Sequence, residues 1–337
     1  TQAPTVTNTP APQAYGPDNF PSDVNPLTGL KVADPKVLDR RPIGVKVNIV
    51  PRTSTRPVFG LSFADIVFDY YHNDGYSRYH AIFYGEDAEL VGPIRSGRLP
   101  DDFLIRMYKS IYTYAGADSR IDQRFYDAEY SNRLLRGGFD APPCPPTAAN
   151  PMCTFEPNGR HNLIASMPGL REWAQRLGID SSRQNLNGMT FHPITPAGGK
   201  PVPQVYVRYS GDNYNRWDYD ASTGRYMLFQ DDVFDQGQGE KYAPLVDRVS
   251  NQPIGADNVV ILFVPHEYFV RPPGEIVDIL LSGAGPAYAF RDGQMFEVIW
   301  NRPAIDSVLY LTFPDGSRYP YKPGKTWYQI LGKSSQF

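Results

Sequence analysis

Residues 56–65 read Arg-Pro-Val-Phe-Gly-Leu-Ser-Phe-Ala-Asp, and residues 92–98 read Gly-Pro-Ile-Arg-Ser-Gly-Arg. Apolar, aromatic-rich segments lie between and after these two runs, bounded by Gly, Asp or Pro: Ile66 to Tyr71, Tyr79 to Tyr84 and Ile111 to Tyr114. Such runs between turn-forming residues are typical of β-strands. This part of the chain therefore predicts a sheet whose connecting loops carry the charged residues.

Four arginines fall at the predicted strand ends and loops of this sheet: Arg56, Arg78, Arg95 and Arg98. The arginine side chain is a planar, permanently charged fork that suits carboxylate or phosphate. Four of them around one sheet edge could form an anion site. In the alternative interpretation they pair with nearby acids and only tie turns together; the candidate partners are Asp65, Asp69, Asp101 and Asp102. Both interpretations stay open, and neither indicates a reaction.

The length and composition favour a two-domain protein rich in strands. A chain of 337 residues exceeds the usual size of a single core. Its 33 Pro, 29 Gly, 23 Tyr and 18 Phe favour strands and turns over a helical bundle. The net charge of -3 argues against a nucleic-acid binder, which needs a positive excess. No apolar run reaches the roughly 20 residues that span a bilayer.

The periodicity predicts an α+β protein. Apolar residues at helical spacing indicate helices over residues 100–110, 122–129 and 168–177, whereas the pattern from Met189 onward is of strands and hairpin turns. We expect an α/β N-terminal domain, residues 26–188, with a mixed sheet and about three helices. A β-rich C-terminal domain, residues 189–337, should follow.

Two cysteines, Cys144 and Cys153, lie in a Pro-rich loop over residues 137–159. They lack the ligand count for structural zinc, and no histidine has the matching spacing, so we expect no metal. A disulfide that pins this loop is the favoured interpretation and would imply an oxidising compartment. The alternative is a pair of thiols.

The first 25 residues contain no Lys or Arg and few aliphatic residues, which predicts an extended tether. Their Thr/Pro-rich composition is typical of a mature N-terminus left after processing, as in a secreted or lipid-anchored protein. A lipidated cysteine would then precede Thr1.

Other polar residues could contribute to a site beside the arginines. Ser96 is not in a nucleophile elbow, so we expect it to cap a turn or donate to a ligand. Asp118 follows a predicted strand, where open α/β sheets place ligand residues. His161 and Asn162 could face the arginines, or they could be a surface histidine and a helix cap. The sequence shows no phosphate-binding glycine loop, and we expect no cofactor.

Several of these motifs, in this order and spacing, resemble the YerB-like family of bacterial envelope lipoproteins. The N-terminal matches are Arg56-Pro57, Ala64 to Val67, Arg78, Gly92 to Ser96, Arg98 and His161-Asn162. The C-terminal matches are Gly283 to Tyr288, Arg291 to Gly293, Trp300 and Gly324 to Trp327. The resemblance implies two domains and a membrane-anchored extracytoplasmic location, and it brings no activity. Where the family tends to have two Glu, this chain has Asp69 and Asn73, which puts in doubt any role that needs both carboxylates.

Three functions are compatible with these features. The first is an extracytoplasmic envelope (lipo)protein that binds an envelope polymer fragment or a small anion, or acts as a scaffold. The second is an envelope hydrolase or transferase that uses Asp65, Asp69 or Asp118 with arginine stabilisation. The third is a structural subunit with a protein partner at the cell surface.

Overall fold

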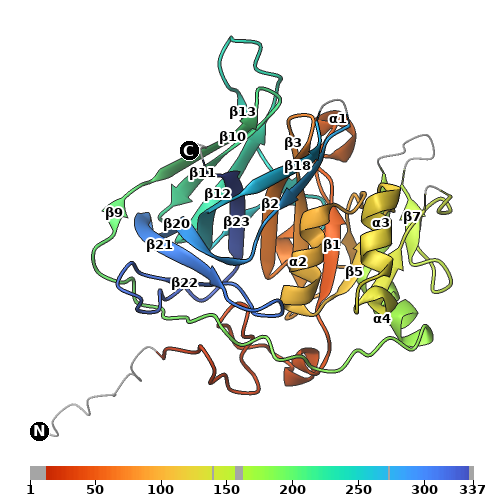
Figure 1. Ribbon diagram of the computed structural model, residues 1–337, viewed down its shortest axis with the longest axis horizontal. Helices are drawn as coiled ribbons and strands as arrows, with labels where there is room; N and C mark the ends of the chain where they lie inside the picture. Colours follow the sequence, from red (N-terminus) through yellow and green to blue (C-terminus); the bar gives the residue numbers. More distant parts are fainter. Residues whose placement is uncertain (1–12, 139, 156–161, 272–273, 334–337) are drawn as a thin grey trace, which may run out of the picture.

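A single mixed sheet of eleven strands runs through the centre of the computed structural model, which describes residues 13–138, 140–155, 162–271 and 274–333. Its order is β22-β21-β20-β17-β23-β2-β3-β1-β5-β6, and β9 pairs with β21 (Figure 1). The strands are β1 (Ile43–Val47), β2 (Ile66–Asn73), β3 (Tyr76–Phe83), β5 (Ile111–Tyr114), β6 (Leu134–Arg136), β9 (Lys200–Pro201), β17 (Asn258–Val264), β20 (Gly283–Arg291), β21 (Gln294–Arg302), β22 (Tyr310–Thr312) and β23 (Thr326–Gly332).

Strands from both halves of the sequence meet in the middle of this sheet. β2 pairs in parallel with β23, from Ile66 opposite Thr326 to Tyr70 opposite Ile330. β23 also pairs in parallel with β17, whose seven residues are all buried. Burial on both faces explains the continuous apolar sequence of β17. The two halves are therefore joined by backbone hydrogen bonds within one sheet.

Two helices cover one face of the N-terminal half of the sheet: α2 (Leu99–Tyr108) and α3 (Ser119–Tyr126). Leu104 and Met107 of α2 pack against Phe68 of β2 in the same buried cluster. α2 starts with Pro100 and two acids, because proline and negative charge both suit the first turn of a helix.

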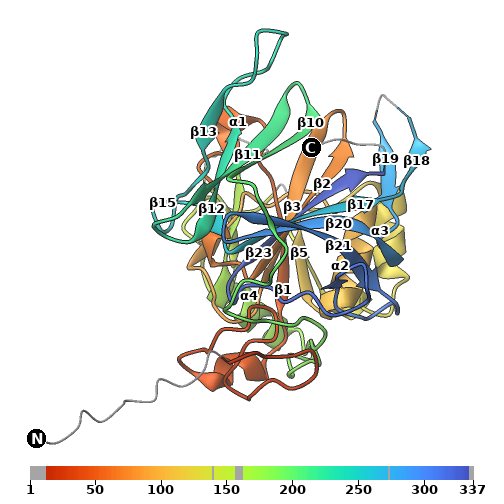
Figure 2. The same cartoon turned by 90° about the vertical axis from the view of Figure 1, so that its left-hand side faces the viewer.

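A smaller sheet covers the opposite face (Figure 2). It contains β10 (Gln204–Ser210), β11 (Asn213–Asp220), β12 (Arg225–Asp231), β13 (Tyr242–Pro244) and β16 (Gly255–Ala256). The Trp217 ring lies 5.2 Å from the Trp327 ring, edge to face, in the core between the sheets. α4 (Met167–Arg176) adds its apolar side to this core.

Short elements complete the fold. They are α1 (Arg52–Thr55), β4 (Leu90–Val91) with β8 (Leu163–Ser166) and β7 (Met152–Thr154), β14 (Val246–Asp247) with β15 (Gln252–Pro253), β18 (His266–Val270) with β19 (Ile276–Ile279), and the 3-10 turns Pro35–Asp39, Leu61–Phe63 and Ser131–Arg133.

The expected α+β class with a mixed sheet is confirmed, and the three predicted helices correspond to α2, α3 and α4. α1 was not predicted, because four residues carry no periodic signal. The boundary near residue 188 stays a prediction. Among the described residues, no helix has both the length and the apolar character needed to cross a bilayer.

The N-terminal segment differs from the expected tether. Tyr15 forms a backbone bridge with Phe191, the Phe20 side chain packs against the core, and Val24 is fully buried. The prediction is therefore wrong for residues 13–25, because a few aromatic and aliphatic side chains suffice to dock them. Residues 1–12 lie outside the described part.

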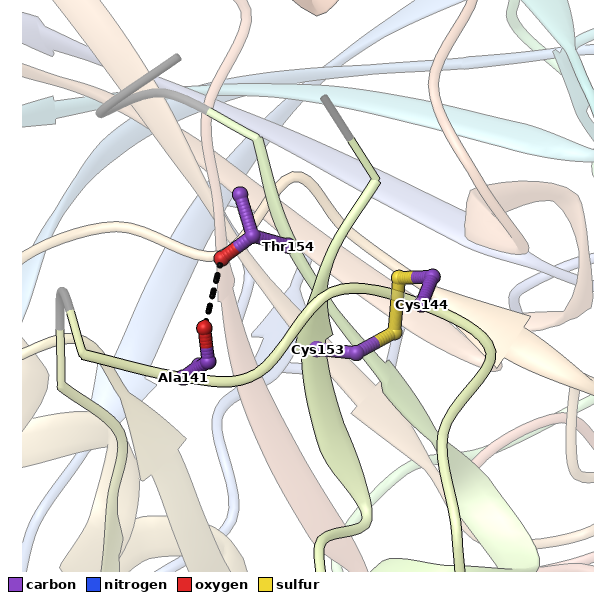
Figure 3. The surroundings of a disulfide bond; sticks show 4 residues. All are labelled: Ala141, Cys144, Cys153 and Thr154. Carbon is purple, nitrogen blue, oxygen red and sulfur yellow. Dashed lines mark hydrogen bonds between the residues drawn. A yellow bond between two sulfur atoms is a disulfide. The ribbon is translucent and has the colours of Figure 1, made fainter. Parts of the chain in front are cut away.

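The predicted disulfide between Cys144 and Cys153 is confirmed (Figure 3). Thr154, the residue after Cys153, donates its hydroxyl to the Ala141 carbonyl oxygen at 3.3 Å. Cys153 is buried against Phe59 and Ile164. The bridge thus fastens the Pro-rich loop to β7, as expected.

Reduction of this disulfide should lower stability by about 2 kcal/mol, because the bridge closes a short loop and the entropic benefit grows only slowly with loop length. We expect the melting temperature to fall by several degrees in a Cys144→Ser/Cys153→Ser variant, measured by calorimetry. Wild-type protein treated with reductant should melt at the same temperature as this variant. An unchanged melt in both samples would contradict the prediction.

Candidate anion-binding site

A buried polar cluster lies between the sheet and the first turn of α2. Lys46 of β1, Tyr70 of β2, His80 of β3 and Asp101 of α2 are all fully buried. Asp101 Oδ1 accepts from Lys46 Nζ at 3.4 Å, from His80 Nδ1 at 2.8 Å and from the Tyr70 hydroxyl. Its Oδ2 accepts from the Arg98 backbone N–H at 2.7 Å. One carboxylate therefore organises donors from three strands and the helix cap.

Gly44 makes room for this cluster on β1. A Cβ atom at this position would lie 2.7 Å from His80 Nε2, closer than real contacts allow. The His80 ring crosses this gap and stacks on Tyr112 of β5, with 5.0 Å between ring centroids. A side chain at residue 44 would thus displace the imidazole that binds Asp101.

Burial dominates the electrostatics of the cluster. It lowers the pKa of Lys46 to about 7. The charges of Arg78 and Arg98 lower this pKa further, whereas the charge of Asp101 raises it. Burial would raise the pKa of Asp101, but Lys46 and His80 outweigh it and hold this pKa well below its ordinary value. Asp101 is therefore ionised at neutral pH, and the net charge around it depends on Lys46.

Three of the four predicted arginines, Arg78, Arg95 and Arg98, lie beside this cluster, and we call them the arginine cluster. Arg78 Nη1 and Arg98 Nη1 donate to the same carbonyl oxygen of Ser96, at 3.1 and 3.4 Å. Burial, followed by the charges of Arg98 and Arg95, lowers the pKa of Arg78 well below its ordinary value. Neither Arg78 nor Arg98 forms an ion pair with a carboxylate of the described residues.

The loop before α2 holds these side chains in place. The Arg95 N–H donates to the Lys46 carbonyl oxygen at 2.9 Å, and the Arg95 carbonyl oxygen accepts from the Ala115 N–H at 3.0 Å. The Arg98 guanidinium also donates to the Gly97 carbonyl oxygen at 2.9 Å. Ser96 thus binds arginines through its backbone, which corrects the expected turn cap, because Arg98 occupies the N-cap of α2.

Arg56 lies elsewhere, so the expectation that all four arginines meet is wrong for this residue. Its Nη2 contacts the Asp231 carboxylate at 3.1 Å, and its Nε donates to the Ile49 carbonyl oxygen at 3.0 Å. Arg52 pairs with the same carboxylate at 2.7 Å. Arg56 thus has a structural ion-pair role, as in the alternative interpretation, but its partner Asp231 is not among the acids which that interpretation named.

The three acids predicted for the site lie apart from one another. Asp65 lies just before β2 and accepts from the N–H groups of Tyr84 and Gly85, which follow β3. Burial raises the pKa of Asp65 to about 6. Asp69 faces the smaller sheet, where Asn215 Nδ2 donates to it at 3.2 Å. Asp118 is the exposed N-cap of α3, and its hydrogen bonds from Arg120 lower its pKa, with a smaller contribution from Arg98. These carboxylates do not form the pair that a hydrolase would use.

The last two predicted residues lie near the disulfide loop. Asn162 is buried before β8, and its carbonyl oxygen accepts from the Phe155 N–H at 3.1 Å. It does not cap α4, because the Ser166 side chain accepts from the Gly169 N–H there. His161 lies outside the described residues. No group of three or more potential metal ligands occurs in the part of the chain that the structure describes.

Sequence reasoning missed Lys46, Tyr70 and His80. Lys46 is the one charged residue of β1, and its strand alternates in a way that suggests an exposed polar face. The sequence nevertheless contained a signal that Lys46 is buried. The amphipathic helix α2 has to cover one face of the sheet, and Asp101 in its first turn can balance the charge of a lysine on that face.

The fold and cluster define an α+β protein of two halves joined in one sheet, with a buried cationic site at the start of α2. Residues 27–179 match the family described as "Protein of unknown function (DUF3048) N-terminal domain", and residues 205–328 match the corresponding C-terminal domain. The chain belongs to this two-domain family, which confirms the resemblance found in the sequence.

Two comparisons with a Bacillus subtilis protein support this assignment. The chain is 28% identical over 327 residues, covering 94% of this chain and 88% of the relative, to a protein named "Putative lipoprotein YerB". It superposes on the crystal structure of YerB with a TM-score of 0.73 and 26% identity, covering 91% of this chain and 96% of that one. Neither comparison supplies an activity.

Proposed function

We propose that this protein is an extracytoplasmic lipoprotein of the cell envelope that binds a small anion at the arginine cluster. The observation that carries the proposal is the pair Arg78 and Arg98, which share the Ser96 carbonyl oxygen while no carboxylate of the described residues pairs with either. The Bacillus relative is named as a lipoprotein, and the disulfide favours an oxidising compartment.

The charge balance favours an anionic ligand. Lys46, Arg78 and Arg98 contribute three positive charges when protonated, and Asp101 contributes one negative charge. Buried like charges repel, and an anion between the guanidinium groups would relieve that repulsion. Arg78 Nε is buried without a hydrogen-bond partner in the described structure, so this guanidinium retains an unused donor. Carboxylate and phosphate both fit such forks.

A thermal-shift experiment on Arg98→Gln tests the proposal. Phosphate or sulfate should stabilise the wild-type protein relative to chloride at matched ionic strength, because a ligand that binds only the folded state raises its melting temperature. In Arg98→Gln this shift should fall to the small general stabilisation that excluded anions give any folded protein, whereas the melting temperature in chloride should change little.

Arg120→Gln is the matched control, because Arg120 is a nearby exposed arginine paired with Asp118. This variant should keep the full shift with phosphate. A phosphate shift of the same size in Arg98→Gln and in the wild type would exclude the site. A fall of about ten degrees in chloride would show that Arg98 acts as a structural tie.

A further inference from the structure

A cavity of about 610 Å³ opens on the molecule away from the arginine cluster. Its walls come from the β2–β3 turn, the end of β10, the start of β18 and the end of β23, and its lining residues include Tyr71, Tyr209, His266, Tyr268 and Lys333. The volume falls within the range of about 300 to 1,000 Å³ that is typical of small-molecule sites.

The sheet topology explains why the cavity forms here. β2 and β23 stay paired until Tyr70 lies opposite Ile330. Beyond this pair, β2 turns into its hairpin with β3 through an irregular register, whereas β23 continues beside β17 to Gly332. The cavity thus lies at the carboxyl ends of three parallel strands. Open parallel sheets bind ligands in the crevice outside the carboxyl ends of their strands.

Two tyrosine side chains of the cavity wall are held rigidly. The Tyr71 hydroxyl donates to the Glu275 carboxylate, which also accepts from the Asp74 N–H at 2.7 Å. The Tyr209 hydroxyl donates to the Asp69 carbonyl oxygen at 3.0 Å. Fixed aromatic rings offer contact area at little cost in conformational entropy.

The polar groups of the cavity are of complementary kinds. His266 Nδ1 contacts the Val264 carbonyl oxygen at 2.9 Å, so Nδ1 carries the proton and Nε2 is left as an acceptor. Burial lowers the pKa of His266, which favours this neutral form. Lys333 is exposed and forms no ion pair within the described chain, whereas Arg208 is held by Asp235 and Glu240. The cavity therefore combines a hydrogen-bond acceptor, a cation that no carboxylate of the described residues neutralises, and the faces of aromatic rings.

We propose that this cavity binds the end of an acidic saccharide. A sugar ring has an apolar face that can pack on the tyrosine rings, its hydroxyl can donate to His266 Nε2, and its carboxylate can pair with Lys333. This second site is independent of the anion site, because its lining residues do not include the arginine cluster.

Trigalacturonic acid is the probe, and α-1,4-galactotriose, which has the same sugar rings without the carboxylates, is its neutral counterpart in calorimetric titrations of the whole chain. We expect heat of binding for trigalacturonic acid and at least about tenfold weaker binding of galactotriose, the loss expected when one charge-assisted contact is removed. Tyr268→Ala and Lys333→Gln should each weaken binding of trigalacturonic acid by a similar factor. The contribution of Lys333 should also decline with added salt.

Phe269→Ala is the matched control, because Phe269 is the exposed neighbour of Tyr268 on β18 and does not line the cavity. It should bind trigalacturonic acid as the wild type does. Arg98→Gln should also bind it normally, which separates this site from the anion site. The absence of binding, equal binding of galactotriose, or equal losses in Tyr268→Ala and Phe269→Ala would each overturn the proposal.

Discussion

Replacing Asp101 by alanine is expected to lower the melting temperature by about 10 °C. Asp101 is the buried acceptor for Lys46, Tyr70 and His80, and it also accepts from the backbone N–H of Arg98, the N-cap residue of α2. Its removal leaves a buried lysine without its counter-charge, which typically costs about 3–5 kcal/mol. Each kcal/mol corresponds to roughly 2–4 °C in domains of 150–250 residues. A calorimetric melt at neutral pH measures this change.

Asp118→Ala is the matched control, because Asp118 also binds a backbone N–H at the start of a helix but is exposed. Its loss should cost about 1 kcal/mol. A Lys46→Met background gives the second control, because Asp101→Ala should cost less once the lysine charge is gone. Equal losses for Asp101→Ala and Asp118→Ala, or additive losses in the Lys46→Met background, would contradict this account of the cluster.

The local elements of the fold could be predicted from the sequence because their signals are local. The apolar run that became β17 and the helical stripe of α4 each specify an element within about ten residues. The β2–β23 pairing could not be predicted, since Ile66 and Thr326 lie at opposite ends of the chain and their pairing leaves no pattern in either strand.

In the candidate site, too, local features could be predicted from the sequence and long-range contacts could not. Arg95 and Arg98 were predicted to lie together because one short loop carries both. Arg56 looked equivalent in the sequence, but its partner Asp231 lies 175 residues downstream. Lys46 was missed because a strand pattern shows which residues share a face but not what covers that face.

Replacing Asp69 by asparagine is expected to stabilise the protein at pH 8 and to have little effect at pH 4.5. Asp69 is fully buried between the two sheets, and this burial raises its pKa to about 7. A carboxyl with a raised pKa favours folding when it is protonated. Its contribution is therefore complete below about pH 4, the ordinary pKa, and is lost as the pH rises through about 7.

Asparagine has nearly the same shape and carries no charge, so it avoids the cost of burying a carboxylate at high pH. Each pKa unit corresponds to about 1.4 kcal/mol, and we expect a gain of a few kcal/mol at pH 8, seen as a melting temperature several degrees higher. Melts of both proteins between pH 4.5 and 8.5 should diverge as the pH rises.

Asp118→Asn should change stability in the opposite direction, because the pKa of Asp118 is lowered, mainly by Arg120. A carboxyl with a lowered pKa stabilises the folded state above its ordinary pKa, so this variant should lose a small amount of stability at neutral pH and none in strong acid. Asp65 also has a raised pKa. Both the wild type and Asp69→Asn contain Asp65, so its contribution cancels in the difference between their stabilities. A difference between wild type and Asp69→Asn that does not change with pH would show that the pKa of Asp69 is the same in the folded and unfolded protein, because Asn215 and its neighbours fully compensate the burial of its charge.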